Sequence, residues 1–240
     1  MIKLAVSGSL GRMGQRITAL ALEDKSFKIV SLLENKDHPN INQTLFNIPI
    51  NSNSSTLKGA DVLIEFTTPL ATLEHLEICR RCKVKMVIGT TGFDPDQIQK
   101  IKKVSKVLPI VFSSNMSVGV NILFKIAQEA AQKLGQDYQV KIIEAHHVHK
   151  KDAPSGTAKT IAQVIEKASQ RKISDIQSIR EGEIIGDHQI VFESAVDTLT
   201  ISHHAKTRDI FAKGSLVAAK FLAKKQKGLF SMQDVLGLSY

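Results

Sequence analysis

The sequence has no tryptophan, two tyrosines and only 5% aromatic residues. Proteins that hold single-stranded nucleic acid stack bases on aromatic side chains, so this scarcity argues against that class. Only two cysteines occur, Cys79 and Cys82, and no signal peptide is recognisable, which predicts a reducing, cytoplasmic environment. The C-x-x-C pair lies in an expected helix without the turn residues of a redox motif, and we interpret it as structural.

The sequence also lacks an apolar run of the roughly 18 residues that a membrane helix needs. Its mean hydropathy of −0.04 is that of a globular chain. Acidic residues are outnumbered, because 23 Asp and Glu stand against 32 Lys and Arg and leave a net charge of +9. Such a field favours an anionic partner: a nucleic acid, a phosphate or a carboxylate. With few aromatic residues and no recognition motif, we expect a small anion, with no nucleic acid and no membrane as partner.

Short apolar runs alternate with amphipathic segments through the first half of the chain. Strands are expected at residues 2–6, 27–33, 61–66, 85–89 and 109–112, and helices at 12–23, 71–81 and 94–104. Repeated strand–helix units predict an α/β fold with a Rossmann-like, doubly wound parallel sheet. Ligand-binding loops are then expected at the carboxyl ends of the strands.

The pattern changes after residue 113. Helices are expected at 121–134 and 157–168, a strand at 140–144, and an antiparallel pair at 189–193 and 196–202. These elements predict a second, smaller α+β domain. A final helical segment at 214–236 is expected to return to the first domain. The predicted domains are therefore 1–117, 118–207 and a C-terminal segment, 208–240.

A glycine-rich loop lies between the first expected strand and helix. It reads Gly8-Ser9-Leu10-Gly11-Arg12-Met13-Gly14, a G-x-x-G-x-x-G variant of the dinucleotide fingerprint. Such a loop turns tightly and directs helix amides at a pyrophosphate. Glu34 follows the second strand, where a carboxylate accepts a ribose 2′-hydroxyl. An ordinary turn is the alternative interpretation, but the order of strand, loop, helix and acid favours a bound dinucleotide. Asn35, Lys36 and Arg12 could tolerate a 2′-phosphate, which leaves NADP open as well as NAD.

Two more small polar loops follow expected strands. Gly89, Thr90 and Thr91 come after the fourth strand, and Ser113, Ser114, Asn115 and Met116 come after the fifth. At these positions they suit a ribose and a nicotinamide amide. Simple turn chemistry is the alternative.

The segment 144–157 is rich in histidine and lysine and precedes a helix. The expected turn at Ser155, Gly156 and Thr157 directs amides outward and favours a carboxylate. Histidine can transfer a proton near neutral pH, and an adjacent lysine supplies positive charge. A zinc site and a solvated basic loop are the alternatives. We expect no metal, because the segment reads as extended rather than as a set of converging ligands.

These motifs resemble those of the 4-hydroxy-tetrahydrodipicolinate reductase (dihydrodipicolinate reductase) family over nearly the whole chain. The matching segments are GSLGRMG at 8–14, EFT at 65–67, VIGTTGF at 87–93, SSNMSVGVN at 113–121, EAHHVHKKDAPSGTA at 144–158 and GLFSMQDVL at 228–236. The resemblance implies a homotetrameric enzyme of diaminopimelate and lysine biosynthesis, in which residues 118–207 form the substrate-binding and oligomerisation domain. It also implies that NADH or NADPH reduces a small cyclic dicarboxylate. A non-catalytic NAD-binding regulator with the same fold is the alternative.

The resemblance also implies residue roles. His146 and Lys150 would be the proton donors, and His147, Ser155, Gly156 and Thr157 would hold the substrate. Cofactor contacts would come from Gly8, Ser9, Leu10, Gly11, Arg12, Met13, Glu34, Gly89, Thr90, Thr91, Ser113, Ser114, Asn115 and Met116. The chain departs from the family at Thr68 and Asn35, where basic residues are common. It is also shorter between Gly182 and Gly186, in a region that contributes to the family's oligomer.

Overall fold

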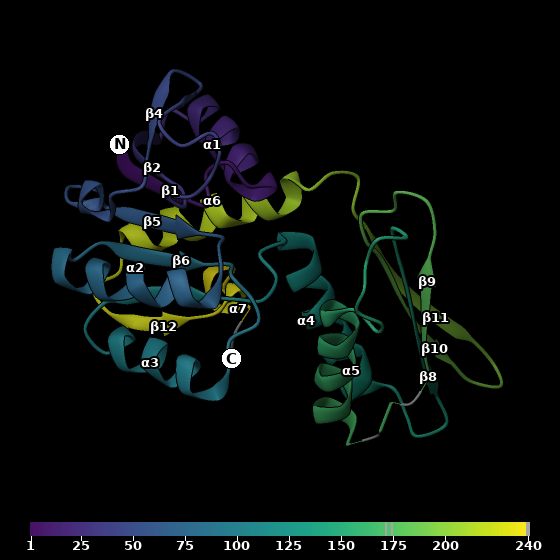
Figure 1. The fold of residues 1–240 in the computed structure, drawn as a ribbon. Coiled ribbons are helices and arrows are strands. Elements are labelled where there is room, and N and C mark those ends of the chain that lie inside the picture. The colour runs from purple at the N-terminus through teal and green to yellow at the C-terminus, as the bar shows by residue number, and fades with distance from the viewer. Residues whose placement is uncertain (171, 174, 239–240) are drawn as a thin grey trace. The chain divides into compact units, whose positions relative to one another are not determined.

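The computed structural model describes residues 1–170, 172–173 and 175–238, and the chain divides into two compact units (Figure 1). Unit 1 comprises Met1–Ser117 and Phe211–Tyr240, and unit 2 comprises Val118–Ile210. Each unit has its own sheet and its own hydrophobic core. Within the described ranges, no helix is both long and apolar enough to span a membrane.

Unit 1 is built on an eight-stranded sheet. Its strands are β1 (Ile2–Ser7), β2 (Phe27–Leu33), β3 (Thr44–Leu45), β4 (Ile48–Asn51), β5 (Val62–Glu65), β6 (Lys85–Ile88), β7 (Pro109–Phe112) and β12 (Gly228–Phe230). The order is β12-β7-β6-β5-β1-β2-β4-β3, and every pair except β3–β4 is parallel. The predicted doubly wound parallel sheet is thus confirmed.

Helices cover both faces of this sheet. They are α1 (Arg12–Glu23), α2 (Pro69–Cys82), α3 (Pro95–Ser105), α6 (Asp209–Ala223) and the short α7 (Met232–Val235), with a 3₁₀ turn η1 at Ser54–Leu57. Because strand side chains alternate, Leu4 and Val6 pack in one cluster with α1 and α6, whereas Ala5 packs in the other with α2 and α3. The sheet is therefore packed between two hydrophobic clusters, which fix the positions of the loops at the carboxyl ends of its strands.

Unit 2 has a four-stranded sheet in the order β11-β10-β8-β9. Its elements are α4 (Val118–Lys133), β8 (Gln139–His146), α5 (Gly156–Ser169), β9 (Ile176–Arg180), β10 (Asp187–Glu193) and β11 (Thr198–His204). β8 runs parallel to β9 and antiparallel to β10, which pairs antiparallel with β11. Ile142, Ile190 and Phe192 from the sheet are buried against Ile161 and Ile165 of α5.

The structure differs from the sequence-based prediction in one helix and in three additional strands. The expected helix over 214–236 is wrong beyond Ala223, because the chain forms β12 and then starts α7 at a capping box of Ser231 and Asp234. Gly228 takes a φ of +126°, which a continuing helix excludes. Strands β3, β4 and β9 were not predicted. They are short or lie at sheet edges, where hydrophobic alternation is weak.

Candidate functional site

The glycine loop of unit 1 is closed tightly between β1 and α1. Gly8 takes a φ of +72°, and a Cβ there would lie 2.4 Å from the Phe66 carbonyl oxygen. A Cβ on Gly14 would lie 2.1 Å from the Gly8 carbonyl oxygen. The amide of Gly11, which is the N-cap residue of α1, donates to that same oxygen at 3.0 Å. Neither Gly8 nor Gly14 has space for a side chain. A loop packed this closely lets a pyrophosphate approach the backbone amides at the start of α1.

Glu34 is fixed beside this loop by two backbone amides. The Leu10 amide donates to Oε2 and the Asn35 amide donates to Oε1, each at 2.9 Å. The carboxylate therefore faces the glycine loop from the end of β2 in a defined orientation. A ribose hydroxyl can donate to its remaining lone pairs, which fits the adenosine half of a dinucleotide.

A cavity of about 620 Å³ lies at this edge of the sheet. Of the predicted cofactor residues, Gly8, Leu10, Gly11 and Glu34 line it. The remaining lining comes from Ser7, Asn35, Lys36, His38, Ser52, Phe66, Thr67, Thr68, Ala71, Glu74 and His75. The departure at Thr68 thus falls on a residue of this cavity, and the threonine caps α2 instead.

The other predicted cofactor residues do not line this cavity. Thr90 is buried and accepts a hydrogen bond from the Thr67 amide at 3.0 Å, so it holds the loop after β5. A Cβ on Gly89 would strike the Phe66 ring. Met116 is buried in the core, whereas Thr91 and Ser114 are exposed. Ser9, Arg12, Met13, Ser113 and Asn115 are likewise outside the cavity lining.

Sequence reasoning missed His75, which lines the cavity from α2. Its Nδ1 lies 2.8 Å from Oε2 of the fully buried Glu65. Burial of the ring is the largest single effect and opposes protonation. The hydrogen bond and charge of Glu65, with the charge of Glu74, together outweigh it and raise the pKa of His75. No local pattern singles out this histidine, because only the packing of α2 on β5 brings the two side chains together.

In unit 2, the alternation of β8 places two polar side chains on its buried face. Ile142, Glu144 and His146 are buried in turn, whereas the residues between them are only partly covered. The carboxylate of Glu144 accepts a short hydrogen bond from His146 Nδ1. This assigns the proton of the neutral ring to Nδ1 and leaves Nε2 as the nitrogen that gains and loses a proton.

Glu144 has two further donors. Its Oε1 accepts from Arg180 Nη2 at 2.8 Å and from the Ser155 amide at 3.2 Å. Burial raises the cost of ionising Glu144, but the Arg180 hydrogen bond, with help from His146, lowers its pKa overall. Burial is the largest effect on His146 and lowers its pKa. The charges of Lys150 and Arg180 lower it further, and together these effects exceed the opposing hydrogen bond and charge of Glu144. The lowered pKa favours the neutral form of the His146 ring at pH 7.

The start of α5 lies against this pair. Ser155 is its N-cap residue, with Oγ accepting from the Ala158 amide at 3.1 Å. Gly156 is exposed and Thr157 half-buried at the first helical positions. The N-terminus of a helix carries partial positive charge, so this position suits a carboxylate.

The loop between β8 and α5 carries the other predicted groups. Lys150 Nζ contacts Asp152 Oδ1 at 2.7 Å, and this ion pair lowers the pKa of Asp152. The amide of His147 donates to the Ile184 carbonyl at 2.7 Å. The structure thus brings His146, Lys150, Ser155 and the α5 N-terminus into one region of unit 2.

His188 and Gly186 complete the surroundings of His146. The His188 ring meets the His146 ring edge-on with centroids 5.2 Å apart, and burial lowers the pKa of His188 to about 4. Its Nε2 lies 3.3 Å from Ser155 Oγ. His188, on β10, is thus a neutral ring that packs against the side of His146. The sequence contained both residues but gave no sign of their proximity.

A methyl group at Gly186 tests whether space around His146 Nε2 matters. A Cβ there would lie 3.1 Å from Nε2. If His146 Nε2 carries the proton, as the sequence predicts, Gly186→Ala should displace the ring and lower kcat by about tenfold, because small misplacements of a reacting group are costly. NADH affinity and Tm should change little. Steady-state kinetics measures kcat, and calorimetry measures NADH affinity and Tm. An unchanged kcat would argue against proton transfer by His146 Nε2.

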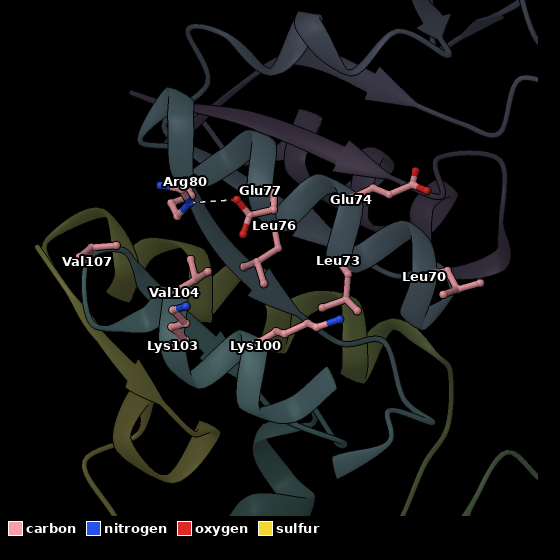
Figure 2. Close-up of a pocket in the computed structure, with 10 residues that line it drawn as sticks. All are labelled: Leu70, Leu73, Glu74, Leu76, Glu77, Arg80, Lys100, Lys103, Val104 and Val107. Carbon is pink, nitrogen blue, oxygen red and sulfur yellow. Dashed lines mark hydrogen bonds and ion pairs between the residues drawn. The ribbon is translucent and has the colours of Figure 1, made fainter. Parts of the chain in front are cut away.

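No group of three or more His, Cys, Asp or Glu side chains in the described ranges is arranged to hold a metal ion. A second cavity, of about 950 Å³, lies between α2 and α3 (Figure 2). It is lined by Leu70, Leu73, Glu74, Leu76, Glu77, Arg80, Lys100, Lys103, Val104 and Val107, none of which was a predicted site residue.

Sequence comparisons match both parts of the chain to one family. Residues 2–116 match the family described as "Dihydrodipicolinate reductase, N-terminus", and residues 119–236 match "Dihydrodipicolinate reductase, C-terminus". The 4-hydroxy-tetrahydrodipicolinate reductase of Nitrosomonas eutropha is 42% identical over 265 residues, covering 99% of each chain. That of Geotalea uraniireducens is 39% identical over 266 residues, covering 99% of this chain and all of the relative.

A solved structure agrees with these matches. The dipicolinate-bound dihydrodipicolinate reductase of Paenisporosarcina sp. TG-14 superposes with a TM-score of 0.84 at 27% identity, over 98% of both chains. An amine dehydrogenase from Mycobacterium smegmatis has a TM-score of 0.68 at 10% identity, over 96% of this chain and 95% of the other. This second likeness concerns the fold alone.

Proposed function

Because the chain belongs to the dihydrodipicolinate reductase family, we propose that it reduces 4-hydroxy-tetrahydrodipicolinate to tetrahydrodipicolinate with NADH or NADPH. The reaction belongs to diaminopimelate and lysine biosynthesis. The observation that carries the proposal is the buried Glu144–His146 pair beside the capped N-terminus of α5. This arrangement combines a proton donor with a carboxylate site, and the reaction needs both.

The chemistry sets what the protein must supply. Replacing the 4-hydroxyl by hydrogen requires loss of water and net addition of one hydride and one proton. The reduced nicotinamide supplies the hydride when bound. The protein must therefore hold two carboxylates, keep a proton ready for the ring carbon next to the one that is reduced, and stabilise the charge that develops there.

Each of these tasks has a candidate residue. We assign His146 Nε2 and Lys150 Nζ as proton donors, and His147, Ser155, Gly156 and Thr157 as the carboxylate site. A bound dianion favours protonation of His146, whose pKa is lowered in its absence. Lys150 is paired with Asp152 and becomes available for substrate when that ion pair opens. Such positioned proton transfer contributes about 10²–10⁴-fold to a rate.

The glycine loop and Glu34 are our proposed cofactor contacts, together with Gly89–Thr91 and Ser113–Met116. Lys36 and His38 line the same cavity as Glu34. Glu34 favours the ribose hydroxyl of NADH, whereas the Lys36 ammonium offers a positive charge and the His38 ring a hydrogen-bond donor to the 2′-phosphate of NADPH. We therefore propose that both cofactors are used.

Lys36 tests this division of roles. We expect Lys36→Gln to raise the KM for NADPH about threefold to tenfold, because an exposed charge-assisted contact to the phosphate is lost. The KM for NADH should stay the same. Lys25→Gln is a matched control, since Lys25 is exposed in unit 1 but does not line the cavity. Equal changes for both cofactors would remove Lys36 from phosphate recognition.

We further infer a cytoplasmic homotetramer. Support comes from the family resemblance and from Cys79 and Cys82, which are both unpaired. The alignment with the N. eutropha relative runs over 265 residues against 240 in this chain, so segments of the relative are missing here. Sedimentation analysis measures the mass in solution, and a monomer at working concentration would contradict the tetramer.

A coupled assay tests the reaction itself. The preceding synthase generates the substrate in place from pyruvate and aspartate semialdehyde, and oxidation of NADH or NADPH is followed by absorbance. Synthase-dependent oxidation with either cofactor is expected. Oxidation at background, with NADH still bound, would instead favour the non-catalytic regulator.

A further inference from the structure

Arg180 of β9 contacts both halves of the proton-donating region. It lies directly across from His146 in the parallel β8–β9 pairing, so both side chains are on one face of the sheet. Its Nη2 donates to Glu144 Oε1 at 2.8 Å and to the Asp152 carbonyl at 2.5 Å. Its Nε donates to the Lys150 carbonyl at 3.3 Å. Nothing in the sequence motifs singles out this arginine.

These contacts connect Arg180 to two separate parts of the region, the Glu144 side chain on β8 and the backbone of the loop after β8. Through Glu144 it reaches the Nδ1 side of His146, and through two carbonyls it holds the loop that carries Lys150. Glu144 is fully buried, so its charge needs a compensating partner. A guanidinium provides donors in a rigid fork and remains charged at every working pH.

We propose that Arg180 is the positioning residue for the reaction, because it fixes the Glu144 carboxylate behind His146 and the backbone of Lys150 in one hydrogen-bonded assembly. Its side chain hydrogen-bonds to the Glu144 carboxylate and to backbone carbonyls of the Lys150 loop, and it would act through the two proton donors. The proposal rests on the proposed function only for its kinetic consequence. The geometric part concerns the state of His146 and is measurable without turnover.

Removal of the arginine has a defined electrostatic consequence. The charged and titratable groups around His146 are Glu144 on its own strand, Lys150 on the following loop, Arg180 on β9 and His188 on β10, with His203 on β11 next to His188. Arg180 is a cation that disfavours the imidazolium and also neutralises Glu144. In Arg180→Met both effects disappear, so the pKa of His146 rises and the alkaline limb of kcat moves to higher pH.

The test compares Arg180→Met with Arg180→Lys, which retains the charge but loses the fork. We expect Arg180→Met to lower kcat about tenfold to hundredfold, with a smaller change in KM. Arg180→Lys should restore the native pH profile and only part of kcat. Arg80→Met is the matched control, because Arg80 is an exposed arginine of α2 whose ion pair with Glu77 lies in unit 1.

An NMR titration of the His146 imidazole separates the proposal from the proposed function. A higher His146 pKa in Arg180→Met supports positioning by Arg180 even if the wild type turns over no substrate. In the double variant Glu144→Gln with Arg180→Met, kcat should fall by less than the product of the two single effects, because Arg180 and Glu144 share one hydrogen bond. An unchanged His146 pKa with native kcat in Arg180→Met would overturn the proposal. If Arg180→Met fails to fold, native kcat in Arg180→Lys would do so.

Discussion

The substitution His146→Asn should reduce kcat by about 10²–10⁴-fold, the usual contribution of a positioned general acid. Asparagine retains a donor for the buried Glu144 carboxylate but has no group equivalent to Nε2 that can carry a proton. The fold and the Glu144 contact should therefore survive, and only the proton transfer should be lost. Steady-state kcat in the coupled assay measures this effect.

His149 offers the matched control for that variant. Its side chain is 77% exposed, three residues along the same loop, and its nearest charged partner is Glu183 at 3.9 Å. We expect His149→Asn to retain native kcat, and both variants to bind NADH with native affinity. Equal losses in the two variants would indicate a general effect on the loop. Native kcat in His146→Asn would remove His146 from the mechanism.

Alanine at Gly14 should weaken NADH binding by more than tenfold and destabilise the protein. The new Cβ would lie 2.1 Å from the Gly8 carbonyl oxygen and 2.6 Å from the Ser9 Cα. Both are backbone atoms, so the loop itself must move. Overpacking of this kind costs about 1–3 kcal/mol, before the loss of the pyrophosphate cradle is counted. Titration of NADH fluorescence and thermal unfolding measure the two effects.

Gly11 provides a graded comparison within the same loop. A Cβ on Gly11 would lie 3.1 Å from the Gly8 carbonyl oxygen, and the φ of Gly11, −69°, is a backbone conformation that alanine adopts readily. We expect Gly11→Ala to keep native Tm within a few degrees and to bind NADH better than Gly14→Ala. If both variants lost affinity equally without loss of stability, crowding against Gly8 would not be the cause.

The parallel sheet was predictable because its strands are short buried apolar runs separated by amphipathic helices. Local patterns also predicted the Gly8–Gly14 loop and Glu34, and the structure brings them together at one cavity. The failure at residues 224–236 has a local cause, because the apolar residues of β12 and α7 continue the helical pattern past the true end at Ala223.

The surroundings of His146 were not predictable in the same way. Alternation along β8 is enough to put Glu144 and His146 on one face. Arg180 and His188, however, reach them through strand pairing, with His146 opposite Arg180 and Glu144 opposite His188. Pairing register joins residues more than thirty positions apart, and hydrophobic pattern within one strand carries no information about it. Such partners become visible only when the strands are paired.

Hydride transfer to the ring is the central claim, and isotopic labelling tests it most directly. The purified protein would be supplied with synthase-generated substrate and with NADH deuterated at the nicotinamide C4 position. We predict one deuterium atom in each tetrahydrodipicolinate molecule, at the carbon that carried the hydroxyl group, when both C4 hydrogens of NADH are replaced by deuterium. In His146→Asn the labelled product should form more slowly, in proportion to kcat. A product without deuterium, or no product while NADH remains bound, would contradict the proposed reaction.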